Sequence, residues 1–179
     1  SRVVKVCDSN AEALKRLKKV YPDMPVTGDS DELIRSGEAD VVAIATPVFT
    51  HYELAKKALL HGKHVFVEKP FTYTTDEAES LIELAEKKGL KIMVDHTFLF
   101  TGAVRKMKEL IGEGALGDLL YFDSTRVNLG LFQHDVNVVW DLAPHDLAIM
   151  DYLIPEKPLA VVATGESHYN RGMEDVASV

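Results

Sequence analysis

The chain has 179 residues, of which 46% are hydrophobic and 27% are charged, and its formal net charge is −8 at pH 7. This is the composition of an ordinary globular protein, and it excludes collagen-like, disordered and disulfide-rich classes. The acidic balance gives no electrostatic basis for binding nucleic acid or an anionic membrane surface.

The cysteine count and the lengths of the apolar runs bear on where in the cell the protein is expected. Cys7 is the only cysteine, so an internal disulfide is excluded and a reducing environment is expected. No apolar run approaches the roughly 20 residues of a membrane helix, and the first residues lack the pattern of a signal peptide. We therefore expect a cytoplasmic protein.

The first 95 residues alternate between strand and helix patterns. Apolar, β-branched runs predict strands at Val3–Cys7, Val41–Ala45, Val65–Val67 and Lys91–Val94. Amphipathic periodicity predicts helices at Ala11–Val20, His51–Leu60 and Glu77–Lys88. Val41–Ala45 is apolar without alternation, which is typical of a strand covered on both faces. This order predicts an α/β fold, a doubly wound parallel sheet with helices on both faces.

After Asp95 the pattern changes. The predicted elements are a helix at Ala103–Ile111, a partly alternating strand at Leu119–Val127, an apolar helix from about Val138 to Leu153, and strands at Leu159–Thr164 and Asp175–Val179. Alternation is typical of a sheet with one less buried face. We therefore predict two domains, residues 1–95 and residues 96–179.

A dinucleotide-binding fold normally opens with a strand, a glycine-rich turn and a helix that hold the pyrophosphate. No G-x-G-x-x-G occurs in the sequence, yet Asp8 ends the first predicted strand, where the acidic residue that follows such a turn is expected. The simplest interpretation is that the chain starts at the second strand of such a fold. Asp8 would then bind the ribose hydroxyls and repel a 2′-phosphate, or else it is a plain helix N-cap.

Two polar segments follow predicted strands. Glu68-Lys69-Pro70 comes directly after Val65–Val67, and Thr46-Pro47 with His51 comes after Val41–Ala45. Ligands of open α/β sheets bind at the carboxyl ends of the strands, so Lys69 is expected at the mouth of that crevice. The alternatives are a surface ion pair between Glu68 and Lys69 and, for Pro47, the start of a helix.

Asp141 and His145 lie four residues apart in the apolar helix, so they share one face of it. Histidine is the usual general base near neutral pH, and a neighbouring carboxylate can orient it. One alternative is that Asp141 caps the helix, with Pro144 in the first turn. Others are a core histidine and a metal site, but no H-E-x-x-H motif or cysteine cluster supports a metal, and none is expected.

Three segments together resemble the Gfo/Idh/MocA family, namely Ala45–His51, Gly62–Pro70 with its E-K-P motif, and Trp140–Asp146 with its D-x-x-x-H motif. The likeness runs from about Val3 to the end of the chain. The family joins an N-terminal Rossmann domain to a C-terminal α/β domain whose open sheet often forms the oligomer interface. The resemblance implies a homo-oligomeric oxidoreductase that transfers a hydride between a secondary alcohol of a sugar-like substrate and NAD(P).

The resemblance also implies residue roles. Lys69 matches the lysine beside the nicotinamide and the reacting hydroxyl, Asp141 and His145 match the D-x-x-x-H pair with His145 as acid/base, and Asp8 favours NAD over NADP. The further positions implied for the cofactor are Thr46, Pro47, His51 and Glu68. Those implied for the substrate, in a stretch similar to members that act on nucleotide-linked sugars, are Arg126, Asn128 and Asn137.

The chain departs from the family pattern at both ends, where the first strand with its glycine loop and most of the C-terminal sheet are absent. In the usual strand order the first strand is central, so edges of the second and fourth strands would be unpaired. We therefore expect the 179-residue chain to bind dinucleotide poorly or to assemble by strand exchange.

Two other functions compete with the dehydrogenase interpretation. One is a non-catalytic sensor or scaffold that keeps the fold. The other uses Lys69 as a Schiff-base nucleophile of the aldolase type.

Overall fold

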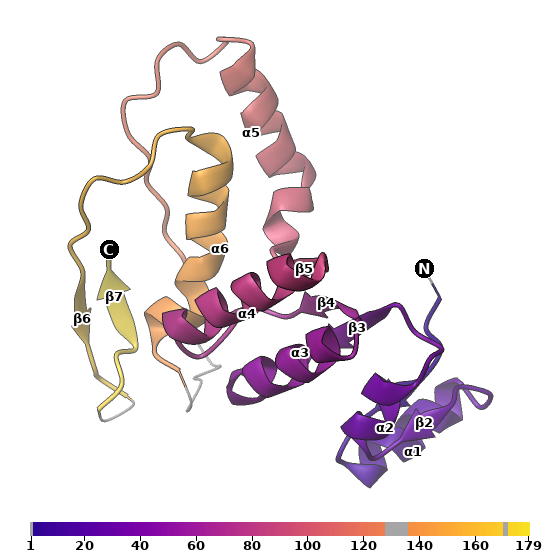
Figure 1. The fold of residues 1–179 in the computed structure, drawn as a ribbon. Coiled ribbons are helices and arrows are strands. Elements are labelled where there is room, and N and C mark those ends of the chain that lie inside the picture. The colour runs from indigo at the N-terminus through magenta and orange to yellow at the C-terminus, as the bar shows by residue number, and fades with distance from the viewer. Residues whose placement is uncertain (1, 128–135, 170–171) are drawn as a thin grey trace. The chain divides into compact units, whose positions relative to one another are not determined.

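The computed structural model describes residues 2–127, 136–169 and 172–179. The chain forms two compact units, Ser1–Asp95 and His96–Val179 (Figure 1). No helix in these described ranges is long and apolar enough to cross a membrane.

The first unit contains all four strands and all three helices that the sequence predicts there. Its elements are β1 (Val6–Cys7), α1 (Ala11–Val20), β2 (Val26–Thr27), α2 (Ser30–Arg35), β3 (Val41–Ile44), the 3₁₀ helix η1 (Val48–Thr50), α3 (His51–Leu60), β4 (His64–Val67), α4 (Thr75–Lys88) and β5 (Ile92–Val94). The sequence missed β2 and α2. Both are too short for a hydrophobic period to reveal them.

The strands of the first unit are parallel and form two sheets. β1 pairs with β2, and β3, β4 and β5 pair in that order, with Val42 opposite Val65 and Val65 opposite Ile92. Among the described residues, β1 and β3 each have one edge without a strand partner. These are the two edges expected from the doubly wound strand order.

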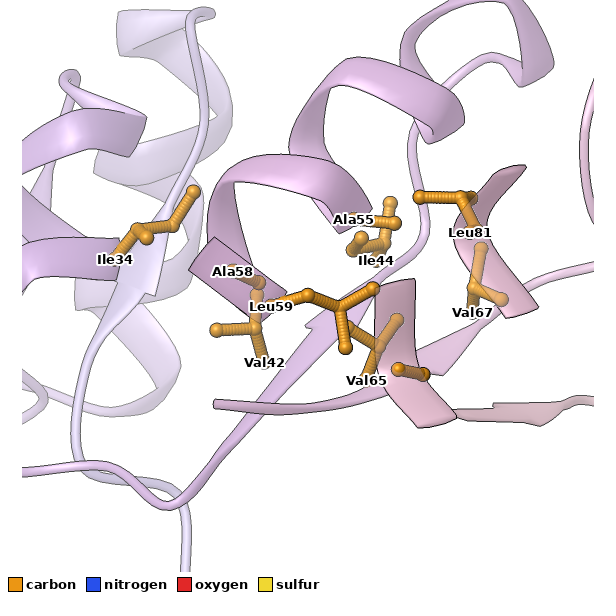
Figure 2. Packing of buried hydrophobic residues seen from close by; sticks show 10 residues of the cluster. Ile34, Val42, Ile44, Ala55, Ala58, Leu59, Val65, Val67 and Leu81 are labelled. Carbon is orange, nitrogen blue, oxygen red and sulfur yellow. The ribbon is translucent and has the colours of Figure 1, made fainter. Parts of the chain in front are cut away.

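The core of the first unit lies on one face of the β3–β5 sheet. Ala55, Ala58 and Leu59 of α3 pack beside Val42 and Val65, and Leu81 of α4 completes this cluster (Figure 2). The α3 and α4 helices also contact each other. This apolar layer holds β3 and β4 in place against α3 and α4, and it therefore also fixes the positions of the residues at the carboxyl ends of these strands.

The opposite face of the same sheet corrects one prediction. In β3, Val42 and Ile44 are buried, but Ala43 is exposed and Val41 is 50% exposed. The prediction that this strand is covered on both faces is therefore wrong for the described part of the chain. An apolar run without alternation shows that both faces are apolar, but it does not show that both are covered.

The ends of α4 follow directly from the sequence. The Thr74 hydroxyl accepts a hydrogen bond from the Glu77 amide, and the Glu77 carboxylate accepts one from the Thr74 amide, which is a complete capping box. Gly89 ends the helix with a φ of 65°, in the left-handed region that favours glycine.

The described residues of the second unit form a 3₁₀ helix, two α-helices and a strand pair. Its elements are η2 (Thr97–Phe100), α5 (Gly102–Gly112), α6 (Val138–Leu153), β6 (Thr164–Glu166) and β7 (Val176–Ser178). The α5 and α6 helices contact each other along their sides, and β6 pairs antiparallel with β7 (Figure 1). Both predicted helices and the predicted strand near the end of the chain are present.

Two strand predictions in this unit are wrong. Residues 119–127 form no strand, and Leu120 and Tyr121 in this segment are 89% and 82% exposed. The predicted strand Leu159–Thr164 instead begins at Thr164, where pairing with Ser178 begins. A strand exists only where a neighbouring strand accepts and donates its hydrogen bonds. Residues 119–127 and 159–163 have no such neighbour among the described residues.

Candidate functional site

The carboxyl ends of β3, β4 and β5 lie at one edge of the first unit's sheet because the three strands are parallel. The Glu68 amide donates to the Ile44 carbonyl at 2.9 Å, and the Asp95 amide donates to the Val67 carbonyl at 2.8 Å. These bonds hold the first residue after each strand in line with the sheet. Thr46, Glu68 and Asp95 therefore lie along the edge at which parallel sheets bind ligands.

The E-K-P segment begins at that edge. The Lys69 amide donates to Oε2 of Glu68 at 3.2 Å, so the Glu68 carboxylate folds back onto the backbone beside the lysine. The Lys69–Pro70 peptide bond is cis. Lys69 itself is half-buried.

The segment after β3 is joined to the E-K-P segment by a histidine. His51, the first residue of α3, is 1% exposed. Its Nε2 lies 2.8 Å from the Thr46 carbonyl oxygen, and its Nδ1 lies 3.0 Å from the Pro70 carbonyl oxygen. The ring therefore lies inside the unit between two backbone carbonyls. Its predicted cofactor role stays a prediction, and the observed contacts of the ring are with the backbone.

Thr46 and Pro47 are both exposed at the end of β3. The Thr50 hydroxyl donates to the Pro47 carbonyl at 2.7 Å, and the Thr46 and Thr50 hydroxyl oxygens are 2.6 Å apart. Because a hydroxyl has one proton, Thr46 must be the donor to Thr50. With both of these bonds formed, the Thr46 hydroxyl oxygen can still accept a hydrogen bond from a ligand. Pro47 precedes η1 directly, which agrees with its predicted place at a helix start.

Asp8 follows β1 directly and is exposed. Its Oδ1 accepts a hydrogen bond from the Asn10 amide at 2.7 Å. The N-cap of α1 is Asn10, whose side chain accepts from the Glu12 and Ala13 amides. The interpretation of Asp8 as a helix N-cap is therefore wrong, and its carboxylate is held in a turn at the end of a parallel strand.

In the second unit, α6 carries the D-x-x-x-H pair. Asn137 caps the helix, and its Oδ1 accepts from the Trp140 amide at 2.9 Å. Asp141 is therefore in the first turn and is not the cap, while Pro144 lies inside the helix. Asp141 and His145 are one turn apart on one face. The cap uses Oδ1 of Asn137 and leaves its amide nitrogen for the predicted contact with substrate.

Phe98 of η2 contacts two of the candidate residues. The His145 ring meets the Phe98 ring edge-on, with centroids 4.8 Å apart and an interplanar angle of 71°, a favourable aromatic geometry. The Arg126 guanidinium carbon lies 4.6 Å from the Phe98 centroid, within the range of a cation–π contact. No sequence pattern pointed to Phe98.

Arg126 is also paired with Asp146, the residue after His145. Its Nε and Nη2 donate to the two carboxylate oxygens at 2.6 and 3.2 Å, and the Ser124 hydroxyl donates to one of them at 2.7 Å. Burial alone would raise the pKa of Asp146, but the hydrogen bonds from Arg126 and Ser124 and the positive charge of Arg126 hold this pKa below its ordinary value. In the sequence, the one feature that could have pointed to Asp146 as a site residue is its position directly after His145 of the D-x-x-x-H motif.

The structure thus brings some of the predicted residues together within each unit. In the first unit, Thr46, His51 and the segment 68–70 are linked by hydrogen bonds. Asp8, at the end of β1, belongs to the other sheet of the first unit.

In the second unit, Arg126 and Asp141 line one cleft of about 1100 Å³. Asn137 and His145 are not among the residues that line this cleft. Asn128 lies outside the described residues. No group of three or more His, Cys, Asp or Glu side chains in the described ranges could hold a metal ion.

Comparison with known proteins identifies the family. Residues 1–96 match the oxidoreductase family with an NAD-binding Rossmann fold, and residues 104–179 match the GFO/IDH/MocA C-terminal domain. The chain belongs to the Gfo/Idh/MocA oxidoreductase family. The resemblance drawn from the three sequence segments is thereby confirmed, as is the Rossmann-like α/β fold followed by the start of the C-terminal domain.

Two curated Gfo/Idh/MocA relatives carry functional names. A UDP-N-acetylglucosamine 3-dehydrogenase from Acidithiobacillus ferrooxidans is 30% identical over 92% of this chain and 51% of its own length. The scyllo-inositol 2-dehydrogenase (NADP(+)) IolW from Bacillus subtilis is 30% identical over 78% of this chain and 37% of its own length. The chain thus spans about half or less of the length of these relatives.

A solved structure agrees with the fold. Apo scyllo-inositol dehydrogenase from Lactobacillus casei matches 94% of this chain and 52% of its own with a TM-score of 0.78. The sequences are 20% identical, so this likeness supports the Gfo/Idh/MocA fold alone.

Proposed function

We propose that this protein transfers a hydride between a secondary alcohol of a sugar-like substrate and NAD(P). Family membership supports the reaction class. The names of two relatives, dehydrogenases of UDP-N-acetylglucosamine and of scyllo-inositol, support a ring that carries secondary hydroxyl groups. The expectations of a homo-oligomer and of a cytoplasmic location stay predictions.

The observation that carries the proposal is the position of Lys69. This lysine follows β4 at the carboxyl edge of a parallel sheet, with Glu68 bonded to β3 before it and Pro70 bonded to His51 after it. A cation held in this way at a ligand-binding edge stabilises negative charge that develops on a bound substrate.

The residues present fit a dinucleotide in part. Asp8, Thr46 and Pro47 are exposed at strand ends and would bind it together with Glu68 and Lys69, whereas the sequence has no glycine-rich turn for the pyrophosphate. The cofactor, when bound, supplies the hydride acceptor. Asp8 would bind the ribose hydroxyls and repel a 2′-phosphate, which favours NAD.

His145 and Lys69 act on the substrate hydroxyl in this proposal. A ring nitrogen of His145 takes the hydroxyl proton, and the positive charge of Lys69 stabilises the alkoxide that forms. Asp141, one turn before His145, orients the imidazole and stabilises its protonated form. General-base assistance of this kind contributes roughly 10²–10⁴-fold to a rate.

Turnover by single variants of the intact protein tests the proposal. We expect Lys69→Ala and His145→Ala each to lower kcat about 100-fold or more, with the Kd for NAD changed only a few-fold, because each removes a group that acts on the reacting hydroxyl. Lys87→Ala and His61→Ala, at exposed positions, are the matched controls.

The turnover measurement and a separate trapping experiment distinguish the dehydrogenase from the two other candidate functions. Unchanged turnover in either variant removes that residue from the mechanism. No turnover of any polyol or nucleotide sugar by the wild-type protein, with dinucleotide still bound, would instead indicate a sensor or scaffold. Trapping of a Lys69 adduct by borohydride would indicate a Schiff base.

A further inference from the structure

We propose that His51 is a positioning residue for Lys69, and that it acts by hydrogen bonding through Nδ1 to the Pro70 carbonyl. This inference rests on the proposed function, because Lys69 is the residue whose placement it explains. It assigns His51 a role through the backbone in place of direct contact with the cofactor.

The first step of the argument is the geometry of the ring. His51 is 1% exposed, and both ring nitrogens lie within hydrogen-bond distance of a backbone carbonyl oxygen, of Thr46 at 2.8 Å and of Pro70 at 3.0 Å. Carbonyl oxygens only accept, so each contact is a hydrogen bond only if that ring nitrogen carries a proton. The bond to Pro70 therefore requires Nδ1–H, which is present in the imidazolium and in one neutral tautomer.

The second step is how the residues on either side of Lys69 are held in place. Before Lys69, the Glu68 amide is bonded to the Ile44 carbonyl at 2.9 Å, which continues the pairing of β4 with β3. After Lys69, the Pro70 carbonyl is bonded to His51. Lys69 is thus a single residue between two fixed points, one supplied by the sheet and one by the histidine.

The third step is the rigidity of the element that carries His51. This residue begins α3, and α3 packs through Ala55, Ala58 and Leu59 against the buried face of the sheet (Figure 2). A side chain that is fixed by a packed helix can position a loop to a fraction of an ångström. A misplacement of about 1 Å at a reacting group can cost about 100-fold in rate.

Two amide variants separate the two bonds of the ring. An asparagine amide nitrogen can occupy the place of Nδ1, and a glutamine amide nitrogen can occupy the place of Nε2. We expect His51→Leu to lower kcat about 30- to 100-fold with KM for NAD changed less than about threefold. We expect His51→Asn to restore a large part of kcat and His51→Gln to restore little. His61→Leu, at the exposed end of the same helix, is the matched control and is expected to leave kcat unchanged.

The ranking of the amide variants distinguishes positioning from mere stabilisation. Loss of a buried histidine lowers the active fraction, so kcat is normalised to the fraction that binds NAD. Equal losses in His51→Asn and His51→Gln after this correction, or no loss in His51→Leu, would overturn the proposal. If Lys69→Ala also keeps full turnover, the proposed function fails; if Lys69→Ala is inactive and His51→Leu is fully active, only the positioning role fails.

A measurement on the wild-type protein needs no activity. Nitrogen-15 NMR of the histidine rings reports which nitrogen of His51 carries a proton. The proposal requires a proton on Nδ1 that exchanges slowly with water. A bare Nδ1 in the folded protein would show that the bond to Pro70 does not form, and it would overturn the inference even if all variants fail to fold.

Discussion

At the scale of single residues, three polar side chains of the first unit's candidate site form hydrogen bonds with the backbone. Asp8 accepts from the Asn10 amide, Glu68 accepts from the Lys69 amide, and His51 contacts two carbonyls. Backbone groups are fixed by the sheet and the helices, so they orient side chains with little added flexibility. The fold of the first unit thereby determines the chemistry of its edge.

Asp8 gives a prediction about cofactor choice. We expect Asp8→Ser in the intact protein to weaken NAD binding about 10- to 100-fold, because hydrogen bonds to a charged group contribute roughly 1.5–3 kcal/mol. Removal of the negative charge should at the same time improve NADP relative to NAD. Calorimetric titration with both cofactors measures this. An unchanged preference would show that Asp8 does not contact the ribose, and Asp23→Ser, at an exposed position, is the control.

Asp146 gives a prediction about pH. Its lowered pKa means that the pair with Arg126 stabilises the folded state above the ordinary carboxyl value of 3.8 and that this stabilisation is lost as the pH falls through the lowered pKa. We expect Asp146→Asn to lower the free energy of unfolding by about 1–3 kcal/mol at pH 7, and by progressively less below pH 4. Urea titrations at several pH values measure the difference.

The control for Asp146 is a pair on the same unit that is more exposed. The Asp151 and Lys157 side chains are 61% and 75% exposed, against 20% and 25% for Asp146 and Arg126. Surface pairs contribute about 0–1 kcal/mol, so Asp151→Asn should change stability little. Equal effects of the two substitutions would contradict the account of the half-buried pair of Asp146 and Arg126.

At the scale of elements, α4 tests how the sheet is fixed. Leu81 is 0% exposed in the core cluster, and its neighbour Ile82 is 47% exposed. We expect Leu81→Ala to lower the free energy of unfolding by about 2–5 kcal/mol and Ile82→Ala by about 1 kcal/mol or less. Chemical denaturation measures both. Similar losses for the two variants would mean that α4 packs in another orientation.

The sequence predicted the positions of the helices and strands better than it predicted strand pairing and the burial of strand faces. Val65–Val67 and Ala11–Val20 are visible from apolar runs and periodicity, because these patterns record which side chains are buried. Pairing partners leave no such record, so the pattern of residues 119–127 predicted a strand although no described strand pairs with them. The burial of Val41 was also predicted wrongly. An apolar residue in the sequence shows that a strand face is apolar, but it does not show whether another element covers that face.

The candidate site was predictable where a residue type is tied to a strand end. Lys69 and Asp8 follow apolar strands and were found by that rule. The sequence could not identify the N-cap residues of α1 and α6. Asp8 and Asn10 are both suitable caps for α1, and Asn137 and Asp141 are both suitable caps for α6. Only the backbone geometry selects one residue of each pair. The contacts of His51 could not be predicted, because its partners are the backbone carbonyls of Thr46 and Pro70, which no side-chain pattern reveals.

At the scale of the whole molecule, the first unit contains two parallel sheets, and among the described residues β1 and β3 each have one edge without a strand partner. Unpaired edges are templates for another strand. We expect the 179-residue chain to bind NAD weakly or to self-associate through these edges. Calorimetric titration and sedimentation measure both properties, and micromolar affinity for NAD in a monomer would contradict this expectation.

The central claim is that Lys69 and His145 serve one chemical step on one substrate hydroxyl. A double-mutant cycle on kcat in the intact enzyme tests it most directly, with Lys69→Ala, His145→Ala and the double variant compared with the wild type. Groups that act as a unit are strongly non-additive, so the double variant should lose little more than the worse single variant. A loss equal to the product of the two single losses would show that the residues act independently and would contradict the account.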